Sequence, residues 1–228
     1  MNKNFDDFIL GNSDEIAYND DIIVFKNEFN DIKNTLNKRN RNSHKGTYGK
    51  VGIVSGSKGM AGAAVLNLNA ALRCGSGLVK AFIPDEIYSV VESMSLEAIT
   101  CTYDQSNFPF EKLQREIIDY SDVVATGSGC TNIYKYVDIL NYLLNNCAQP
   151  LVIDAEGINK LSLDILLKHN QPIILTPHYG EMARLVNKDI EYLQTDIIKK
   201  ASDFSKGYNI YLVLKGARTI ISCPDGEV

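Results

Sequence analysis

Residues 51–64 read VGIVSGSKGMAGAA, and this stretch decides the fold. Its first five residues form a short run in which Val51, Ile53 and Val54 are apolar and β-branched, which is typical of a buried strand. Small residues follow from Gly56 and open a segment rich in Ala and Leu, 61–73, which predicts a well-packed helix. A buried strand, a tight turn and a helix together are the first half of a βαβ unit.

The same alternation continues to the end of the chain. Further strands are predicted at 78–83, 99–101, 122–126, 151–153, 172–175 and 210–214, and further helices at 87–92, 110–120, 132–145, 161–168, 181–186 and 195–206. A last segment, 218–222, is expected to pair with the residues after it. Strands separated by helices predict an α/β fold with a mostly parallel sheet and helices on both faces.

The N-terminal part of the chain differs from the rest. Residues 1–37 are rich in Asn and Asp, and we expect a partly ordered arm with one strand-like run at 22–25 and a short helix at 28–36. Residues 38–228 then form the α/β domain. A basic run at 38–45 either contacts phosphate or forms a solvated turn, and the turn is the favoured interpretation.

Composition and charge restrict the class of protein. Of the 228 residues, 45% are hydrophobic and 22% charged, which is typical of a globular chain. No run approaches the ~18 apolar residues of a membrane span. The N-terminus lacks the apolar core of a signal peptide, so we expect a cytoplasmic protein. The net charge of −5 disfavours a nucleic-acid surface, so we expect neither a nucleic-acid nor a membrane partner.

Cysteines and histidines give no metal motif. The five cysteines include no Cys-x-x-Cys pair, and the three histidines form no ligand cluster. We therefore expect reduced thiols and no structural or catalytic zinc, and we assign no residue as a metal ligand.

Polar and glycine-rich residues follow four of the predicted strands, at 55–57, 126–129, 154–156 and 176–178. Ligands of parallel sheets bind outside the carboxyl ends of the strands, so these residues are the candidate site. The turn at 56–64 either binds an anion at a helix N-terminus or is a tight strand-to-helix turn with small packing residues. The turn at 127–129 either holds a phosphate or sugar hydroxyl through free amides or is a flexible turn. Asp154 and Glu156 either hold Mg²⁺ or a substrate hydroxyl, or Asp154 caps the next turn.

Two further motifs carry charged side chains. His178, Glu181 and Arg184 crowd a strand-to-helix junction, where a functional role is favoured over a surface ion pair between Glu181 and Arg184. Lys215 and Arg218 lie between two strands and either bind nucleotide phosphates or belong to an ordinary hairpin turn.

Taken in order, these motifs resemble one family. The order runs from HKGTYG at 44–49, through Gly56-Ser57 and Gly62-Ala63-Ala64, to the Asp154 motif, Thr-Pro-His-x-Gly-Glu at 176–181 and Leu-Lys-Gly-Ala at 214–217. Residues 38–228 are similar to the ADP- or ATP-dependent NAD(P)H-hydrate dehydratases, the carbohydrate-kinase-like half of the bifunctional nicotinamide nucleotide repair enzymes.

The resemblance implies a ribokinase-like, three-layer α/β fold and a repair reaction. The S-epimer of hydrated NADH or NADPH receives the terminal phosphate of ADP or ATP, with Mg²⁺, on its ring hydroxyl, and phosphate then leaves to restore the double bond. Hydroxide is a poor leaving group and phosphate a good one, so the protein mostly positions groups and neutralises charge.

The resemblance also assigns residues and partners. The hydrate-binding positions are Ala64, Gly129, Asn159, His178, Glu181 and Arg184, and the nucleotide-binding positions are Lys215, Gly216, Ala217, Arg218 and Thr219. The expected partners are the hydrated dinucleotides, an NAD(P)H-hydrate epimerase domain or protein, and further copies of the chain in a homo-oligomer.

The chain departs from the family pattern at three places. Glu156 stands where the family usually has Asp, and residues 127–130 read GSGC in place of Gly-Pro-Gly-Leu-Gly. The family pattern also continues past Val228 with a Gly-rich stretch ending Gly-x-Gly-Asp, whose Asp is the general base. We therefore expect these 228 residues alone to be inactive or nearly so, and to expose apolar sheet surface.

Two other functions stay open from the sequence. One is a kinase of a small vitamin precursor with the same fold, which the Thr-Pro-His-x-Gly-Glu motif beside His-Lys-Gly disfavours. The other is a non-catalytic remnant that binds nucleotide, which the missing Asp favours.

Overall fold

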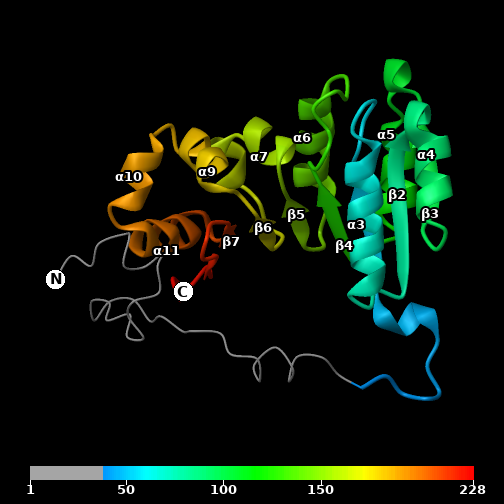
Figure 1. The fold of residues 1–228 in the computed structure, drawn as a ribbon, viewed down its shortest axis with the longest axis horizontal. Coiled ribbons are helices and arrows are strands. Elements are labelled where there is room, and N and C mark those ends of the chain that lie inside the picture. The colour runs from blue at the N-terminus through cyan, green and yellow to red at the C-terminus, as the bar shows by residue number, and fades with distance from the viewer. Residues whose placement is uncertain (1–37) are drawn as a thin grey trace.

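The computed structural model describes residues 38–228, which form one sheet of eight strands (Figure 1). In chain order the strands are β1 (Lys50–Val54), β2 (Leu78–Pro84), β3 (Ile99–Tyr103), β4 (Val123–Thr126), β5 (Leu151–Ile153), β6 (Ile173–Leu175), β7 (Tyr211–Leu214) and β8 (Ile220–Ser222). Their order across the sheet is β3-β2-β1-β4-β5-β6-β7-β8. All neighbours are parallel except β7 and β8, so the predicted mostly parallel sheet is confirmed.

Helices connect the strands. They are α3 (Ala61–Arg73), α4 (Tyr88–Met94), α5 (Phe110–Leu113), α6 (Tyr136–Asn146), α7 (Glu156–Lys160), α8 (Leu163–Leu166), α9 (Tyr179–Leu185), α10 (Ile190–Gln194) and α11 (Ile197–Tyr208). Helix α5 continues into a π-helical turn, η4 (Gln114–Ile118), and a short 3-10 turn, η1 (Lys45–Tyr48), precedes β1. Within residues 38–228, no helix is long and apolar enough to cross a membrane.

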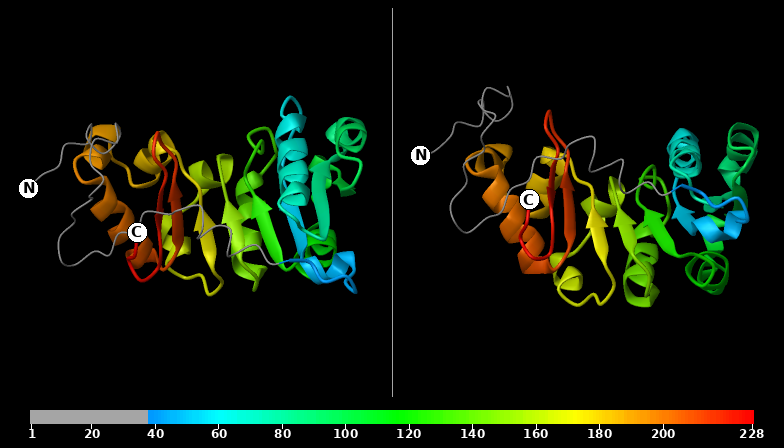
Figure 2. Two further views of the ribbon diagram at one scale, coloured as in Figure 1. Left: turned by 60° about the horizontal axis from the view of Figure 1, so that its bottom comes forward. Right: turned by 90° about the horizontal axis from the view of Figure 1, so that it is seen from below.

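Two hydrophobic cores lie on opposite faces of the sheet, because alternate strand residues point to opposite sides. On one face, Leu68 of α3 and Val91 of α4 pack with Ile53 of β1. On the other face, Leu140 of α6 belongs to a larger core that includes Ile153 of β5. Figure 2 shows helices on both faces, with α3 and α4 over the β1–β3 part of the sheet. The structure therefore has the three layers that were predicted.

Part of the sheet surface is exposed at β7 and β8. Tyr211 and Ile221 are 40% and 44% exposed, whereas their neighbours Leu212 and Ile220 point to the opposite face and are buried. Tyr211 and Ile221 therefore lie on a partly exposed face of the sheet.

Several predicted element bounds are wrong. The helix expected at 132–145 begins at Tyr136, because the chain first passes through turns that end at Lys135 with φ of 52°. The helix expected at 161–168 shortens to α8, and the short helices α7 and α10 were not predicted. Segment 218–222 pairs with the strand before it, not with the residues after it, because the turn at 215–219 reverses the chain into a hairpin.

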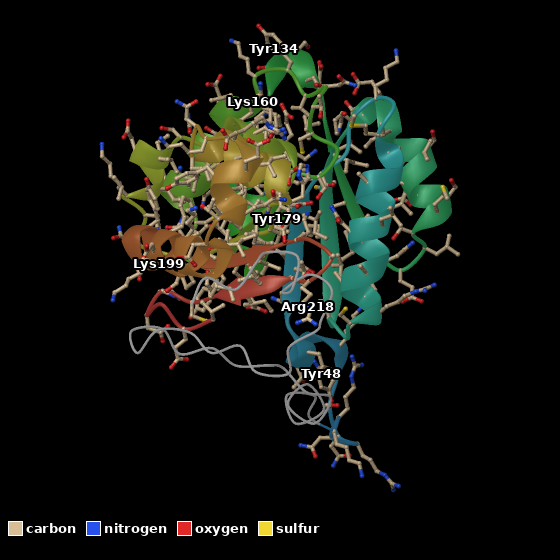
Figure 3. All side chains as sticks on the ribbon, turned by 60° about the vertical axis from the view of Figure 1, so that its left-hand side comes forward. Tyr48, Tyr134, Lys160, Tyr179, Lys199 and Arg218 are labelled. Carbon is tan, nitrogen blue, oxygen red and sulfur yellow. The ribbon has the colours of Figure 1, made fainter. Side chains whose placement is uncertain are left out.

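The segment 38–49 lies at the edge of the sheet away from the strands' carboxyl ends. Arg39 stacks over the Tyr48 ring at 4.2 Å and donates a hydrogen bond of 2.7 Å to the carbonyl of Gly75. Figure 3 shows Tyr48 at the end of the molecule opposite Tyr134. The interpretation of this basic run as a turn is therefore supported. The strand expected at 22–25 and the helix expected at 28–36 lie outside the described residues.

Candidate functional site

The direction in which the chain crosses the sheet changes between β1 and β4. The chain moves from β1 through β2 to β3 in one direction across the sheet and from β4 to β7 in the other. Ligands of open α/β sheets bind outside the carboxyl ends of the strands at such a point. The four strand ends predicted from the sequence all lie at this edge, because β1, β4, β5 and β6 are parallel.

The loops after β1 and β4 are bound to each other. Ser55 Oγ and the amide of Gly56 donate to the carbonyl of Ser128, at 2.6 and 3.0 Å. Ser57 Oγ donates to the carbonyl of Gly129 at 2.7 Å. Ser55 and Ser57 are fully buried, so their hydroxyls satisfy backbone groups that water does not reach. The interpretation of residues 127–129 as a flexible turn is therefore not supported.

Glycine is required where these loops meet. Gly129 has φ of +70°, and a Cβ there would lie 2.7 Å from the Cβ of Ala63. Gly56 has φ of +78°, and a Cβ there would lie 2.9 Å from the Cβ of Ala64. Ala64 itself is fully buried, so in this structure its methyl group packs beneath the loop. The structure thus packs Gly129 against Ala63 and Ala64 against Gly56, where the loops after β1 and β4 meet.

The Asp154 carboxylate connects four strand ends. Its Oδ1 accepts hydrogen bonds from Thr176 Oγ1 at 2.7 Å and from Lys215 Nζ at 2.8 Å. Its Oδ2 accepts one from Ser128 Oγ at 3.0 Å. The predicted capping role of Asp154 is wrong, because the N-cap of α7 is Ala155 and carries no side-chain cap.

Opposing effects act on the pKa of Asp154. Partial burial of the carboxyl raises this pKa. The hydrogen bond and charge of Lys215, with the hydroxyls of Thr176 and Ser128, outweigh burial and hold the pKa below its usual value of 3.8.

This lowered pKa predicts an acid-sensitive contribution to stability. The pKa of Asp154 is lower in the folded than in the unfolded chain. The stability that its carboxylate contributes is therefore fully present above the unfolded-state pKa and is lost as the pH falls through the folded-state pKa. We expect Asp154→Asn to have a lower free energy of unfolding than wild type near neutral pH, and the difference between the two to become smaller below about pH 4. Urea unfolding of both proteins from about pH 3 to 7 measures this difference. A difference that does not change with pH would contradict the prediction.

The backbone after Asp154 is strained. Ala155 has φ of 49° and ψ of −116°, a conformation that residues with a Cβ rarely adopt. Such a conformation costs about 1–3 kcal/mol and persists only where the surroundings fix it. The close packing of Gly127 against the Asp154 carbonyl is one such constraint.

His178 caps helix α9. Its Nδ1 accepts hydrogen bonds from the amides of Gly180 and Glu181, at 2.9 and 3.2 Å. The Glu181 carboxylate accepts one from the His178 amide at 2.8 Å, which completes a capping box. The ring of His178 is 54% exposed, whereas the Glu181 side chain is 8% exposed. The other ring nitrogen, Nε2, lies 3.5 Å from Glu181 Oε1, so the buried Glu181 carboxylate contacts His178 through both its amide and its half-exposed ring.

Arg184 and Asn159 join α7 to α9. Arg184 Nε and Nη2 both donate to Asn159 Oδ1, at 3.1 and 3.0 Å. The alternative of a Glu181–Arg184 ion pair is wrong, because Glu181 is bound to His178 and Arg184 to Asn159. The structure thus brings two predicted hydrate-binding residues, Asn159 and Arg184, into direct contact.

The predicted nucleotide-binding residues form the turn between β7 and β8. Lys215, Gly216, Ala217 and Thr219 are exposed, and Arg218 is half-buried. The Lys215 amide donates to the carbonyl of Pro177 at 2.7 Å, which holds the turn beside His178. A Cβ on Gly216 would lie 2.3 Å from the Tyr179 hydroxyl, so glycine lets Tyr179 pack against the turn.

Among residues 38–228, no three His, Cys, Asp or Glu side chains gather in a way that could hold a metal ion. A Mg²⁺ ion at this edge would be held mainly by nucleotide phosphates, with at most one or two carboxylates, as is usual for that ion.

Comparison with known proteins assigns the chain to a family. A carbohydrate-kinase family model described as NAD(P)H-hydrate dehydratase matches residues 51–228, more than half of the chain. The chain belongs to the NAD(P)H-hydrate dehydratase family. The chain is similar to the bifunctional NAD(P)H-hydrate repair enzyme Nnr of Moorella thermoacetica, with 36% identity over 205 residues. The matched region covers 86% of this chain and 38% of that protein.

Other relatives agree. The ADP-dependent (S)-NAD(P)H-hydrate dehydratase of Neisseria meningitidis is 33% identical over 195 residues, which cover 83% of this chain and 63% of that protein. The Bacillus subtilis ADP/ATP-dependent NAD(P)H-hydrate dehydratase, co-crystallized with ATP/Mg²⁺, matches with a TM-score of 0.72 and 27% identity. That match covers 84% of this chain and 66% of the other.

The fold comparison also extends to a more distant protein. A ribokinase-like superfamily protein from Enterococcus faecalis has a TM-score of 0.72 at 22% identity, covering 91% of this chain and 70% of that one. The predicted ribokinase-like fold is therefore confirmed. The dehydratase-family chain spans 38% of the length of the Moorella relative.

Sequence reasoning gave no individual role to Ser128 or Thr176, although both donate to Asp154. Each hydroxyl directly follows a strand that ends at the ligand edge. That placement was the available signal, because parallel neighbours bring such residues together.

Proposed function

We propose that this chain contributes to the nucleotide-dependent dehydration of the S-epimer of hydrated NADH or NADPH. The proposal rests on one observation above all: a model of the NAD(P)H-hydrate dehydratase family matches residues 51–228. The names of the Neisseria and Bacillus relatives support ADP or ATP as the phosphoryl donor, and the ATP/Mg²⁺ of the Bacillus crystals supports Mg²⁺ as its companion ion.

The geometry supports one division of labour at the sheet edge. We propose that the hydrate lies over the carboxyl ends of the strands, with contacts from Gly129, Asn159, His178 and Arg184. The buried residues Ala64 and Glu181 support this site through packing and capping. The nucleotide lies over the turn formed by Lys215, Gly216, Ala217, Arg218 and Thr219. The Pro177–Lys215 hydrogen bond places these two groups of residues next to each other, as transfer between two ligands requires.

The chemistry asked of these residues is positioning and neutralisation. A phosphoryl group carries charge that Lys215 can balance, because its ammonium lies at the edge and is partly exposed. Of the two ring nitrogens of His178, Nδ1 accepts from amides of α9, so a hydrogen bond to the hydrate would come from Nε2, which also lies 3.5 Å from Glu181 Oε1.

The test is a turnover and binding experiment. The full-length natural protein is mixed with hydrated NADPH, ADP or ATP and Mg²⁺, and the return of the reduced-nicotinamide absorbance is followed while calorimetry measures ligand binding. Absorbance that returns only with nucleotide supports the proposal. Phosphorylation of a vitamin-precursor alcohol without hydrate repair would favour a kinase instead. Nucleotide binding with no turnover of either compound would favour a non-catalytic binding role.

The proposed setting of the reaction follows from the relatives. The Moorella relative is named as a bifunctional repair enzyme, so we propose that an epimerase domain or protein supplies the S-epimer to this site. We further propose a cytoplasmic homo-oligomer. Size-exclusion chromatography with light scattering tests the oligomer.

A further inference from the structure

The Asp154 carboxylate is almost saturated by hydrogen-bond donors of the protein. A carboxylate oxygen has two lone pairs, and both on Oδ1 are used, by Thr176 and by Lys215. Oδ2 accepts from Ser128, which leaves one lone pair. A carboxylate engaged in this way is poorly suited to ligate a metal ion and well suited to hold its donors in place.

Asp154 is the fixed member of its pair with Lys215. Its amide donates to the carbonyl of Thr126 at 3.1 Å, and its carbonyl accepts from Gly157 at 2.9 Å. The strained Ala155 follows it directly. The Lys215 side chain, in contrast, is 45% exposed at the end of a flexible stem. The geometry therefore lets Asp154 orient the ammonium.

The ammonium keeps donors for a ligand. A lysine ammonium has three N–H groups, and Lys215 directs one of them at Asp154 Oδ1. The remaining groups are available to anionic oxygens arriving at the strand edge. Pairing with a fixed carboxylate also reduces the rotamer entropy that a long side chain loses when a ligand binds.

We propose that Asp154 is a positioning residue that holds the Lys215 ammonium for the phosphates of the nucleotide. The inference rests on the proposed function, because it takes the nucleotide to bind at the β7–β8 turn. Asp154 acts through Lys215 and does not contact the nucleotide.

A double-mutant cycle tests this role. Binding of ADP and of ATP, each with Mg²⁺, is measured by calorimetry for wild type, Asp154→Asn, Lys215→Met and the double variant. We expect Lys215→Met to weaken binding by about 10- to 100-fold, as for loss of a charged hydrogen bond. We expect Asp154→Asn to weaken it by several-fold, and the double variant to match Lys215→Met within about twofold.

Two further variants guard against a purely structural effect. Asp122 precedes β4 at the amino ends of the strands, where its carboxylate accepts a hydrogen bond of 2.8 Å from the Lys50 amide. The control variant Asp122→Asn should bind nucleotide like wild type. Asp154→Glu keeps the charge and should recover part of the affinity lost in Asp154→Asn, even if both variants are less stable than wild type in urea unfolding.

The outcomes separate this inference from the proposed function. If Lys215→Met weakens binding while Asp154→Asn binds like wild type or more tightly, the positioning role is wrong and the nucleotide site stands. If the loss of affinity in the double variant is the product of the losses in the two single variants, the positioning role is also wrong, since Asp154 would then act independently of Lys215. If the wild type binds neither nucleotide, the proposed function fails and this inference falls with it.

Discussion

Replacement of Gly127 by alanine should destabilise the protein by about 3–5 kcal/mol, the sum of backbone strain and overpacking. Gly127 has φ of +114°, where a residue with a Cβ is strongly disfavoured. A Cβ there would also lie 1.9 Å from the carbonyl oxygen of Asp154 and 2.8 Å from the amide of Gly157. Both are backbone atoms, so relief requires that the loops after β4 and β5 separate.

A second glycine isolates the backbone-strain part of this effect. Gly59 has φ of +86°, but a Cβ there would meet nothing within 4 Å. Gly59→Ala should therefore cost only the strain, about 1–2 kcal/mol. Urea unfolding of the two variants and wild type gives both free energies. Equal losses for Gly127→Ala and Gly59→Ala would show that the β4 and β5 loops are not packed as described.

The fold was predictable because its signal repeats along the chain. Apolar β-branched runs such as residues 51–55 recur between segments of helical spacing, and each parallel crossover restricts the next. The short helices α7 and α10 were missed for a physical reason. Helices of about five residues are not stable by their own propensity, and packing of Ile158 and Leu193 against the core fixes them.

The site was predictable by location and not by pairing. The strand-end pattern placed Asp154, His178 and Lys215 at one edge, and the structure agrees. No local pattern indicates that Lys215 forms a hydrogen bond with Asp154, 61 residues away. Nor does any local pattern indicate that His178 Nδ1 caps a helix. Such contacts depend on the register of neighbouring strands, which a single sequence does not specify.

His178→Asn should separate the two roles of this residue. Asparagine is among the preferred N-cap residues, so its side-chain oxygen can accept from the α9 amides that His178 Nδ1 now serves. We expect the free energy of unfolding to stay within about 0.5 kcal/mol of wild type. The variant has no atom in place of Nε2, the ring nitrogen that does not cap α9. We expect affinity for hydrated NADPH to fall by about 10- to 100-fold.

His178→Ala is the matched control, because it removes the cap as well as Nε2. It should lose about 0.5–2 kcal/mol of stability while its affinity for the hydrate falls as far as in His178→Asn. Calorimetric titration with hydrated NADPH, beside urea unfolding, measures both quantities for each variant. Wild-type affinity in His178→Asn combined with weak binding in His178→Ala would mean that His178 serves only to begin helix α9. The hydrate would then be held by Asn159 and Arg184, whose contact across α7 and α9 depends on that helix being in place.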